Sequence, residues 1–379
     1  MVSHNDPNGQ NYLGDMYQNG YGVKQSYSKA VEWYLKAAKQ GNIEAQDNLG
    51  YMYAHGYGVK KSYSEAAKWH LKAAKQGDSN AQHSLGVEYL YGKGVTKSYK
   101  DAVKWFTKSA EQGNTNAQIN LGYMYQMGYG VDKSDIKALK WYHKAAEQGD
   151  ADAQYNIGRM YLYRQGIKSY AEAVKWFIKS AEQGNADAQT NLGYMYEMGY
   201  GVEQSYLKAA DLYQKAANQD NIKAQTNLGI MYEYGHGVEK SYLKAVELYR
   251  KSAKQGDANA QYNLGVMYYN GYGVEQSYSK AVEWYHKAAV QGDVDAQFNL
   301  GFMYYNGYGI KQSYSKAAEW FHQAAKQNDA DSQYNLGIMY ANGIGVEKSY
   351  SKAVEWFRKA AKQGNKIAKQ NLKILGEKE

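Results

Sequence analysis

The 379-residue chain has no cysteine and a single proline, Pro7. Without cysteine there can be no disulfide framework, no thiolate metal site and no cysteine nucleophile. No apolar run is long enough to cross a bilayer, and no charged-then-apolar leader follows Met1. From the chain as given we expect a cytoplasmic protein without membrane insertion. If a leader had been removed, secretion into a host or a periplasmic location would be the expectation instead.

The composition is that of a folded protein with a few positions copied many times. Hydrophobic residues make up 44% of the chain, which indicates a packed core and not a disordered chain. Forty-five Lys and Arg against 37 Asp and Glu give a net charge of +8, which permits acidic partners without requiring them. The 42 tyrosines are the unusual feature, and they point to internal repetition.

A dipeptide of Leu or Ile followed by Gly recurs along the chain. Its ten glycines are Gly14, Gly50, Gly86, Gly122, Gly158, Gly193, Gly229, Gly265, Gly301 and Gly337. Every interval between them is 36 residues except the step from Gly158 to Gly193, which is 35. A fixed period of this size is typical of a solenoid, in which each unit packs only on its neighbours.

Each unit has the pattern of a helix hairpin. In the second unit, Ala45, Leu49 and Met52 form one apolar stripe of a first helix, which the glycine pair after His55 ends. A second helix is predicted to begin after a serine, because a serine side chain can cap the free amides of a first turn. That serine is present in all ten units, at positions 26, 62, 98, 134, 169, 205, 241, 277, 313 and 349.

The unit reads Ala-Gln-x-Asn-Leu-Gly-x-Met-Tyr-x-x-Gly-x-Gly-Val, then Ser-Tyr-x-Lys-Ala-x-x-Trp-Tyr-x-Lys-Ala-Ala-x-Gln-Gly, and it resembles the Sel1-like repeat, a relative of the tetratricopeptide repeat. The resemblance implies an all-α, right-handed α-solenoid of ten repeats of 35–36 residues with a C-terminal capping helix. We expect an extension at 1–8, one solenoid domain at 9–367 and a partial repeat at 368–379 that acts as the cap. Members of this family are adaptors and scaffolds, so the resemblance also implies protein binding without catalysis.

Candidate chemistry is sparse outside the repeat. The eight histidines include no pair at i, i+4, and no serine, histidine and carboxylate recur together as a triad would require. The methionine and tryptophan columns fit core packing better than a cofactor site. The sequence therefore predicts no catalytic residue, no metal, no cofactor and no small-molecule substrate.

The positions that vary between copies are the informative ones. On the first helix they lie opposite the buried stripe, and in helical solenoids of this kind that surface lines the concave groove. Toward the C-terminus these columns become aromatic or aliphatic, with an asparagine beside them, which suits a protein or peptide partner. The predicted groove residues are Tyr262, Val266, Tyr269, Asn270, Phe298, Phe302, Tyr305, Asn306, Tyr334, Ile338 and Asn342.

A secondary groove is predicted where the fifth unit has a shortened loop, Tyr163-Arg164-Gln165-Gly166. It comprises Tyr155, Arg159, Leu162 and Tyr163, and the short loop is expected to bend the solenoid there.

Several readings stay open beside the scaffold. If the adjoining unit covered the variable positions of the first helix, these residues would serve core packing and would not form a binding surface. An immunity or inhibitor protein that occludes a toxin would differ from a scaffold only in its partner. Recurrent lysines and aromatics raise a single-stranded nucleic-acid binder as a further alternative, although alternating acids and bases favour a solvated face. Some relatives bind or slowly hydrolyse β-lactams, which would make the chain an enzyme.

Overall fold

The structure, a computed structural model, describes residues 6–164 and 168–376, and these form helices and no strand. The described residues therefore have the all-α architecture that the repeat predicts. None of the described helices is long and apolar enough to span a membrane. The helices are α1 (Pro7–Asn19), α2 (Tyr27–Lys39), α3 (Ile43–His55), α4 (Tyr63–Lys75), α5 (Ser79–Tyr91), α6 (Tyr99–Glu111), α7 (Thr115–Met127), α8 (Asp135–Glu147), α9 (Ala151–Tyr163), α10 (Tyr170–Glu182), α11 (Ala186–Met198), α12 (Tyr206–Ala217), α13 (Ile222–Tyr234), α14 (Tyr242–Lys254), α15 (Ala258–Asn270), α16 (Tyr278–Val290), α17 (Val294–Asn306), α18 (Tyr314–Lys326), α19 (Ala330–Asn342), α20 (Tyr350–Lys362) and α21 (Lys366–Ile374).

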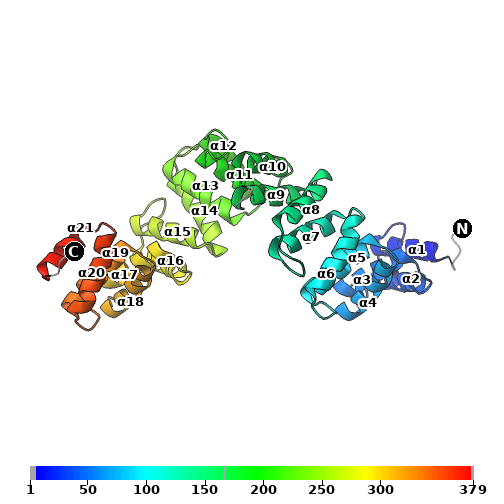
Figure 1. Ribbon diagram of the computed structural model, residues 1–379, viewed down its shortest axis with the longest axis horizontal. Coiled ribbons are helices and arrows are strands. Elements are labelled where there is room, and N and C mark those ends of the chain that lie inside the picture. The colour runs from blue at the N-terminus through cyan, green and yellow to red at the C-terminus, as the bar shows by residue number, and fades with distance from the viewer. Residues whose placement is uncertain (1–5, 165–167, 377–379) are drawn as a thin grey trace. The chain divides into compact units, whose positions relative to one another are not determined.

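The chain divides into two compact units, Met1–Asn185 and Ala186–Glu379. Within each unit, an odd-numbered helix packs against the helix that follows it to make a hairpin, and that hairpin packs against the next (Figure 1). In the second unit, α21 continues the series by packing on α20. Each unit is thus a stack of helix hairpins, the arrangement of a solenoid.

The helix boundaries follow the predicted capping residues. Each of the ten serines accepts a hydrogen bond from the backbone N–H three residues ahead; Ser62, for example, accepts from Glu65 at 3.3 Å. The first helices end at a glycine in the left-handed region, such as Gly271 with φ 76°, except for α9, which ends at Arg164 in extended backbone. The serine caps and glycine ends predicted from the sequence are therefore confirmed.

Each second helix places one buried ring against the first helix of its own hairpin. We call the position of that residue in the repeat the ring position. Its occupants, in chain order, are Tyr34, His70, Phe106, Tyr142, Phe177, Tyr213, Tyr249, Tyr285, Phe321 and Phe357, all buried. The glycine of the Leu-Gly dipeptide gives the ring its space, because a Cβ on Gly265 would lie 2.6 Å from Cδ1 of Tyr285. This close approach explains why the glycine recurs inside a helix, where it is otherwise unfavourable.

A buried glutamine joins each hairpin to its neighbour. Gln82 donates from Nε2 to the Ala74 carbonyl at 3.1 Å, and its Oε1 accepts from Gln112 Nε2 at 2.7 Å. Equivalent pairs recur along both units, for example Gln291 to Gln261 at 2.8 Å. Buried amides need such partners, so the ladder fixes the register between repeats.

Candidate partner-binding site

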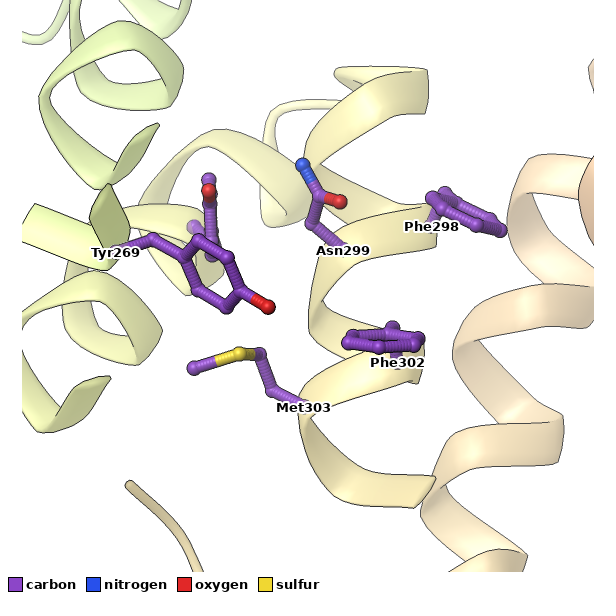
Figure 2. A pocket seen from close by; sticks show the side chains of 6 residues that line it. Tyr269, Phe298, Asn299, Phe302 and Met303 are labelled. Atoms are coloured by element: carbon purple, nitrogen blue, oxygen red, sulfur yellow. The ribbon is translucent and has the colours of Figure 1, made fainter. Parts of the chain in front are cut away.

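Some of the predicted groove residues line a hollow of about 230 Å³ in the second unit. We call this hollow the aromatic slot. Its lining residues are Tyr269 of α15, Tyr285 of α16, and Phe298, Asn299, Phe302 and Met303 of α17. In Figure 2, Tyr269 reaches from α15 toward Met303 and Asn299, whereas the Phe298 ring projects from the other side of α17. Three of the predicted residues thus line one hollow.

The Tyr285 hydroxyl distinguishes this slot. In four other repeats a tyrosine at the ring position donates its hydroxyl to a Gln or Glu near the end of the preceding helix; Tyr249 donates to Glu233 at 2.7 Å and Tyr213 to Glu197 at 2.8 Å. We call the position of this Gln or Glu on the first helix the facing position. In the hairpin of α15 and α16 it holds Tyr269, and no group in the described chain accepts from the Tyr285 hydroxyl.

Burial keeps that hydroxyl protonated. It raises the pKa of Tyr285 well above the ordinary value for tyrosine, and the nearby Tyr262 and Tyr269 add to the shift. At neutral pH the side chain is therefore a hydrogen-bond donor. Tyr285 lines the slot, so a ligand that brings an acceptor can accept a hydrogen bond from its hydroxyl.

The predicted groove residues differ in how open they are. Phe302 is 37% exposed, and Asn270 and Asn342 are exposed. The rest are partly buried, namely Tyr262, Val266, Tyr269, Phe298, Tyr305, Asn306, Tyr334 and Ile338. The surface is neither sealed between hairpins nor fully open.

In each of the three groove repeats, the first aromatic residue of the predicted set packs against the core, whereas the helical spacing had placed it on the open surface. The ring centroid of Tyr262 lies 5.9 Å from that of Tyr285, Phe298 lies 5.7 Å from Phe321, and Tyr334 lies 6.0 Å from Phe357. One part of each ring therefore packs against the core, and the other part remains accessible on the surface. The exposed face of the groove is carried more by Phe302, one helical turn further along.

The three asparagines are partly engaged within their own helices. Nδ2 of Asn270 donates to the Val266 carbonyl at 3.0 Å, and Asn306 and Asn342 make the same bond at 2.9 Å. Each amide therefore stabilises its helix end with one hydrogen. The second amide hydrogen and the side-chain oxygen take no part in this bond.

The predicted secondary groove is only partly formed. The Arg159 guanidinium lies 5.6 Å from the Tyr155 ring centroid, and Tyr163 is 61% exposed. Leu162 is a correction: it is 5% exposed, because it occupies the facing position of a repeat whose ring is Phe177. A phenyl ring needs no acceptor, so an aliphatic side chain covers it. Gln165 and Gly166 of the shortened loop lie outside the described residues.

One recurrent lysine of the second helix is paired with tryptophan in most repeats. In seven repeats a lysine Nζ lies 3.9–5.1 Å from the ring centroid of the tryptophan one turn earlier, in Lys36, Lys72, Lys108, Lys144, Lys179, Lys287 and Lys359. His143, His286 and His322 meet the next repeat's tryptophan edge-on. These cations and rings already contact one another within the chain, so they give less support to the hypothesis of a nucleic-acid-binding surface.

Stacked helix hairpins with a surface slot define the chain as a helical repeat protein. The family profile of the Sel1 repeat matches ten consecutive segments, 7–42, 43–78, 79–114, 115–150, 151–185, 186–221, 222–257, 258–293, 294–329 and 330–365. The chain belongs to the Sel1 repeat family. We number the repeats by these segments.

Solved structures with similar folds include other proteins of the Sel1 repeat kind. A protective antigen of uropathogenic Escherichia coli with an SLR fold is 42% identical, with a TM-score of 0.83, over 97% of this chain and 79% of that chain. A Sel1 repeat protein from Oxalobacter formigenes is 30% identical over 99% of this chain and 95% of that chain, with a TM-score of 0.47. An immunity protein from Pseudomonas aeruginosa is 21% identical over 56% of this chain and 82% of that chain, with a TM-score of 0.37. No curated protein matches the sequence.

Proposed function

We propose that the chain is a non-enzymatic scaffold that holds a peptide segment of a partner protein across repeats 8–10. Sel1 repeat proteins are in general protein-interaction scaffolds. The observation that carries the proposal for this surface is the aromatic slot, where an exposed phenylalanine adjoins a tyrosine hydroxyl that has no acceptor in the described chain. A peptide supplies both complements, an apolar side chain and a backbone carbonyl.

The size of the slot agrees with this proposal. Pockets for cofactors and drug-sized ligands commonly span about 300–1,000 Å³. The aromatic slot, at about 230 Å³, has room for one anchoring side chain, and exposed Phe302 extends its wall along α17. An extended peptide with one anchor in the slot and others on neighbouring repeats would fit such a surface.

The chemistry of the slot favours binding over catalysis. Its lining offers phenyl rings, a thioether, an amide and phenols, and burial holds the pKa of Tyr285 well above its usual range. General acid or base catalysis works best with groups that titrate near neutral pH. We therefore propose that the slot recognises a partner and does not transform it.

The test uses peptides selected from a random display library on the intact protein. Tyr285→Phe removes only the unbonded hydroxyl, and phenylalanine already occupies the ring position of four repeats. We expect the variant to bind selected peptides about twofold to tenfold more weakly, the usual effect of one neutral hydrogen bond. Tyr249→Phe is the matched control, because its hydroxyl is already bonded to Glu233, and it should leave the affinity unchanged.

A second variant tests the apolar anchor. Phe302→Ser should weaken the same peptides about thirtyfold, as for a residue at the centre of an interface. Tyr123→Ser changes the equivalent position of repeat 4, which is 41% exposed, and serves as the control. Selected peptides that bind both variants as tightly as the wild type would contradict this assignment, as would failure to select any peptide.

A further inference from the structure

A second slot lies at the equivalent place between repeats 2 and 3, in the first unit. We call it the polar slot, and its volume is about 390 Å³. The residues equivalent to those of the aromatic slot are Ala54, His70, His83, Ser84, Val87 and Glu88. The same architecture therefore holds a different set of functional groups.

Two of these residues depart together from their columns. His70 is the only ring position that is neither tyrosine nor phenylalanine, and Glu88 stands where the nine other repeats have methionine. Nδ1 of His70 lies 2.8 Å from Oε1 of Glu88, and the two residues are 4% and 6% exposed. The departures belong to different repeats but meet in one slot, so they act as a pair.

The Glu88 carboxylate has acceptor capacity to spare. A carboxylate offers about four acceptor sites. Oε1 is bonded to His70, whereas Oε2 accepts no hydrogen bond from the described residues although it is buried. A buried acceptor of this kind calls for a donor, and Glu88 lies in the wall of the slot. The wall thus favours a ligand with an O–H or N–H group.

The rim of the polar slot is cationic and aromatic. Lys61 and Lys93 lie on the rim, with Nζ atoms 4.9 and 5.6 Å from the Tyr63 ring centroid. Neither forms an ion pair within the described parts of the chain. Tyr51 and Val87 also line the slot and offer apolar surface. Two cations at the entrance repel a cationic ligand and attract an anionic one.

We propose that the polar slot binds a phenol that carries an anionic group, with the hydroxyl donating to Glu88 and the anion beside Lys61 and Lys93. The ring lies against Tyr51 and Val87. This chemistry is shared by a small hydroxyphenyl carboxylate and by a tyrosine flanked by acidic residues in a partner protein. The site lies in the first unit and does not depend on the aromatic slot of the second.

Three probes separate the contributions. The probes are 4-hydroxyphenylacetate, phenylacetate without the hydroxyl, and tyramine, which has an ammonium in place of the carboxylate. Binding is followed by the ring ¹H–¹⁵N signals of His70, assigned by their loss in His70→Phe. We expect 4-hydroxyphenylacetate to bind at least tenfold more tightly than phenylacetate, because a hydrogen bond to a charged acceptor is a strong one. Tyramine should bind at least threefold more weakly than 4-hydroxyphenylacetate.

Variants locate the donor and the anion. Glu88→Met introduces the residue of the other nine repeats and should remove the preference for the hydroxyl. Lys61→Gln with Lys93→Gln changes only rim residues, so it tests the site even if Glu88→Met fails to fold, and it should remove the preference for 4-hydroxyphenylacetate over tyramine. Glu65→Gln, an exposed carboxylate paired with Lys68, is the control and should change neither preference.

The outcomes decide the proposal. Equal binding of phenylacetate and 4-hydroxyphenylacetate would overturn it, and so would tyramine binding as tightly as the acid. A preference that survives in Glu88→Met would also overturn it. The peptide acetyl-Asp-Tyr-Asp-amide distinguishes the sources: tighter binding than 4-hydroxyphenylacetate indicates a partner protein, and weaker binding indicates a free small molecule.

Discussion

Removing either member of the buried His70–Glu88 pair is expected to loosen the second and third repeats. In Glu88→Met, the Nδ1 hydrogen of His70 loses its acceptor at 2.8 Å in a site that is 4% exposed. Removing one partner of a buried, hydrogen-bonded ionisable pair costs about 3–5 kcal/mol. Burial of the methionine offsets about 1.5–3 kcal/mol. The midpoints of these two ranges differ by about 2 kcal/mol, which is the net loss that we expect.

His70→Phe should be the more damaging single change. It leaves the Glu88 carboxylate buried without a donor, and it also removes the imidazole 3.8 Å from Asp47. The expected loss is about 3–5 kcal/mol. The double variant, with both changes, reproduces the pairing of Phe106 with Met124 in the next slot. It should be as stable as the wild type or up to about 4 kcal/mol more stable, because exchanging a buried ionisable pair for hydrophobic residues is often neutral or favourable.

Hydrogen exchange of the segment 63–91 in the intact protein measures these changes. Local exchange is the right assay because repeat stacks need not unfold in a single step. Glu88→Met should speed exchange there about tenfold to hundredfold, since 1.4 kcal/mol is a factor of ten. The reasoning fails if the double variant is less protected than either single variant, or if both singles match the wild type.

Two further predictions concern neighbouring groups. Burial raises the pKa of Asp47 to about 6, with opposing and reinforcing effects from His70, Asp78 and Glu88. The contribution of Asp47 to stability is therefore fully present below the unfolded pKa of about 3.9 and is lost as the pH rises through 6. Hydrogen exchange in α3–α5 should become faster between pH 4 and 7, by an amount that corresponds to about 3 kcal/mol. Asp47→Asn should flatten this pH dependence, whereas the exposed Asp132→Asn should not. Gly265→Ala should destabilise α15 and α16 by about 1–3 kcal/mol and weaken peptide binding in the aromatic slot, because the new Cβ would lie 2.6 Å from Tyr285 Cδ1; full retention of both would refute the packing argument.

Much of the fold could be predicted from the sequence because each repeat carries its own local signals. A serine that caps a first turn and a glycine that ends a helix act within a few residues, so their places in the sequence are their places in the structure. Ser241 and Gly271 illustrate both cases. The Leu-Gly spacing gave the repeat number for the same reason.

The chemistry of the slots could not be predicted in this way, because it joins residues from different helices. Helical spacing placed Phe298 on the variable side of α17, but it could not reveal that Phe321 of the following helix lies beneath its ring. A comparison between copies does hold a signal for the facing position. Tyrosine at the ring position goes with Gln or Glu there in four repeats, and phenylalanine goes with Leu, Tyr or Ala. Tyr285 with Tyr269 is the exception that marks the aromatic slot.

The slots also explain how one repeat can diverge while its neighbours stay constant. Each slot is bounded by one hairpin and the first helix of the next hairpin. A replacement in a slot therefore changes contacts between these two adjacent repeats. The glutamine ladder and the serine caps lie outside the slots and hold the stack in register whatever the slots contain. A pair such as His70 and Glu88 can therefore arise in one slot by two changes, in two adjacent repeats, while the aromatic slot keeps its rings. Recognition by such a chain is a set of separate side-chain pockets on a common frame, and each pocket can be altered without altering the next.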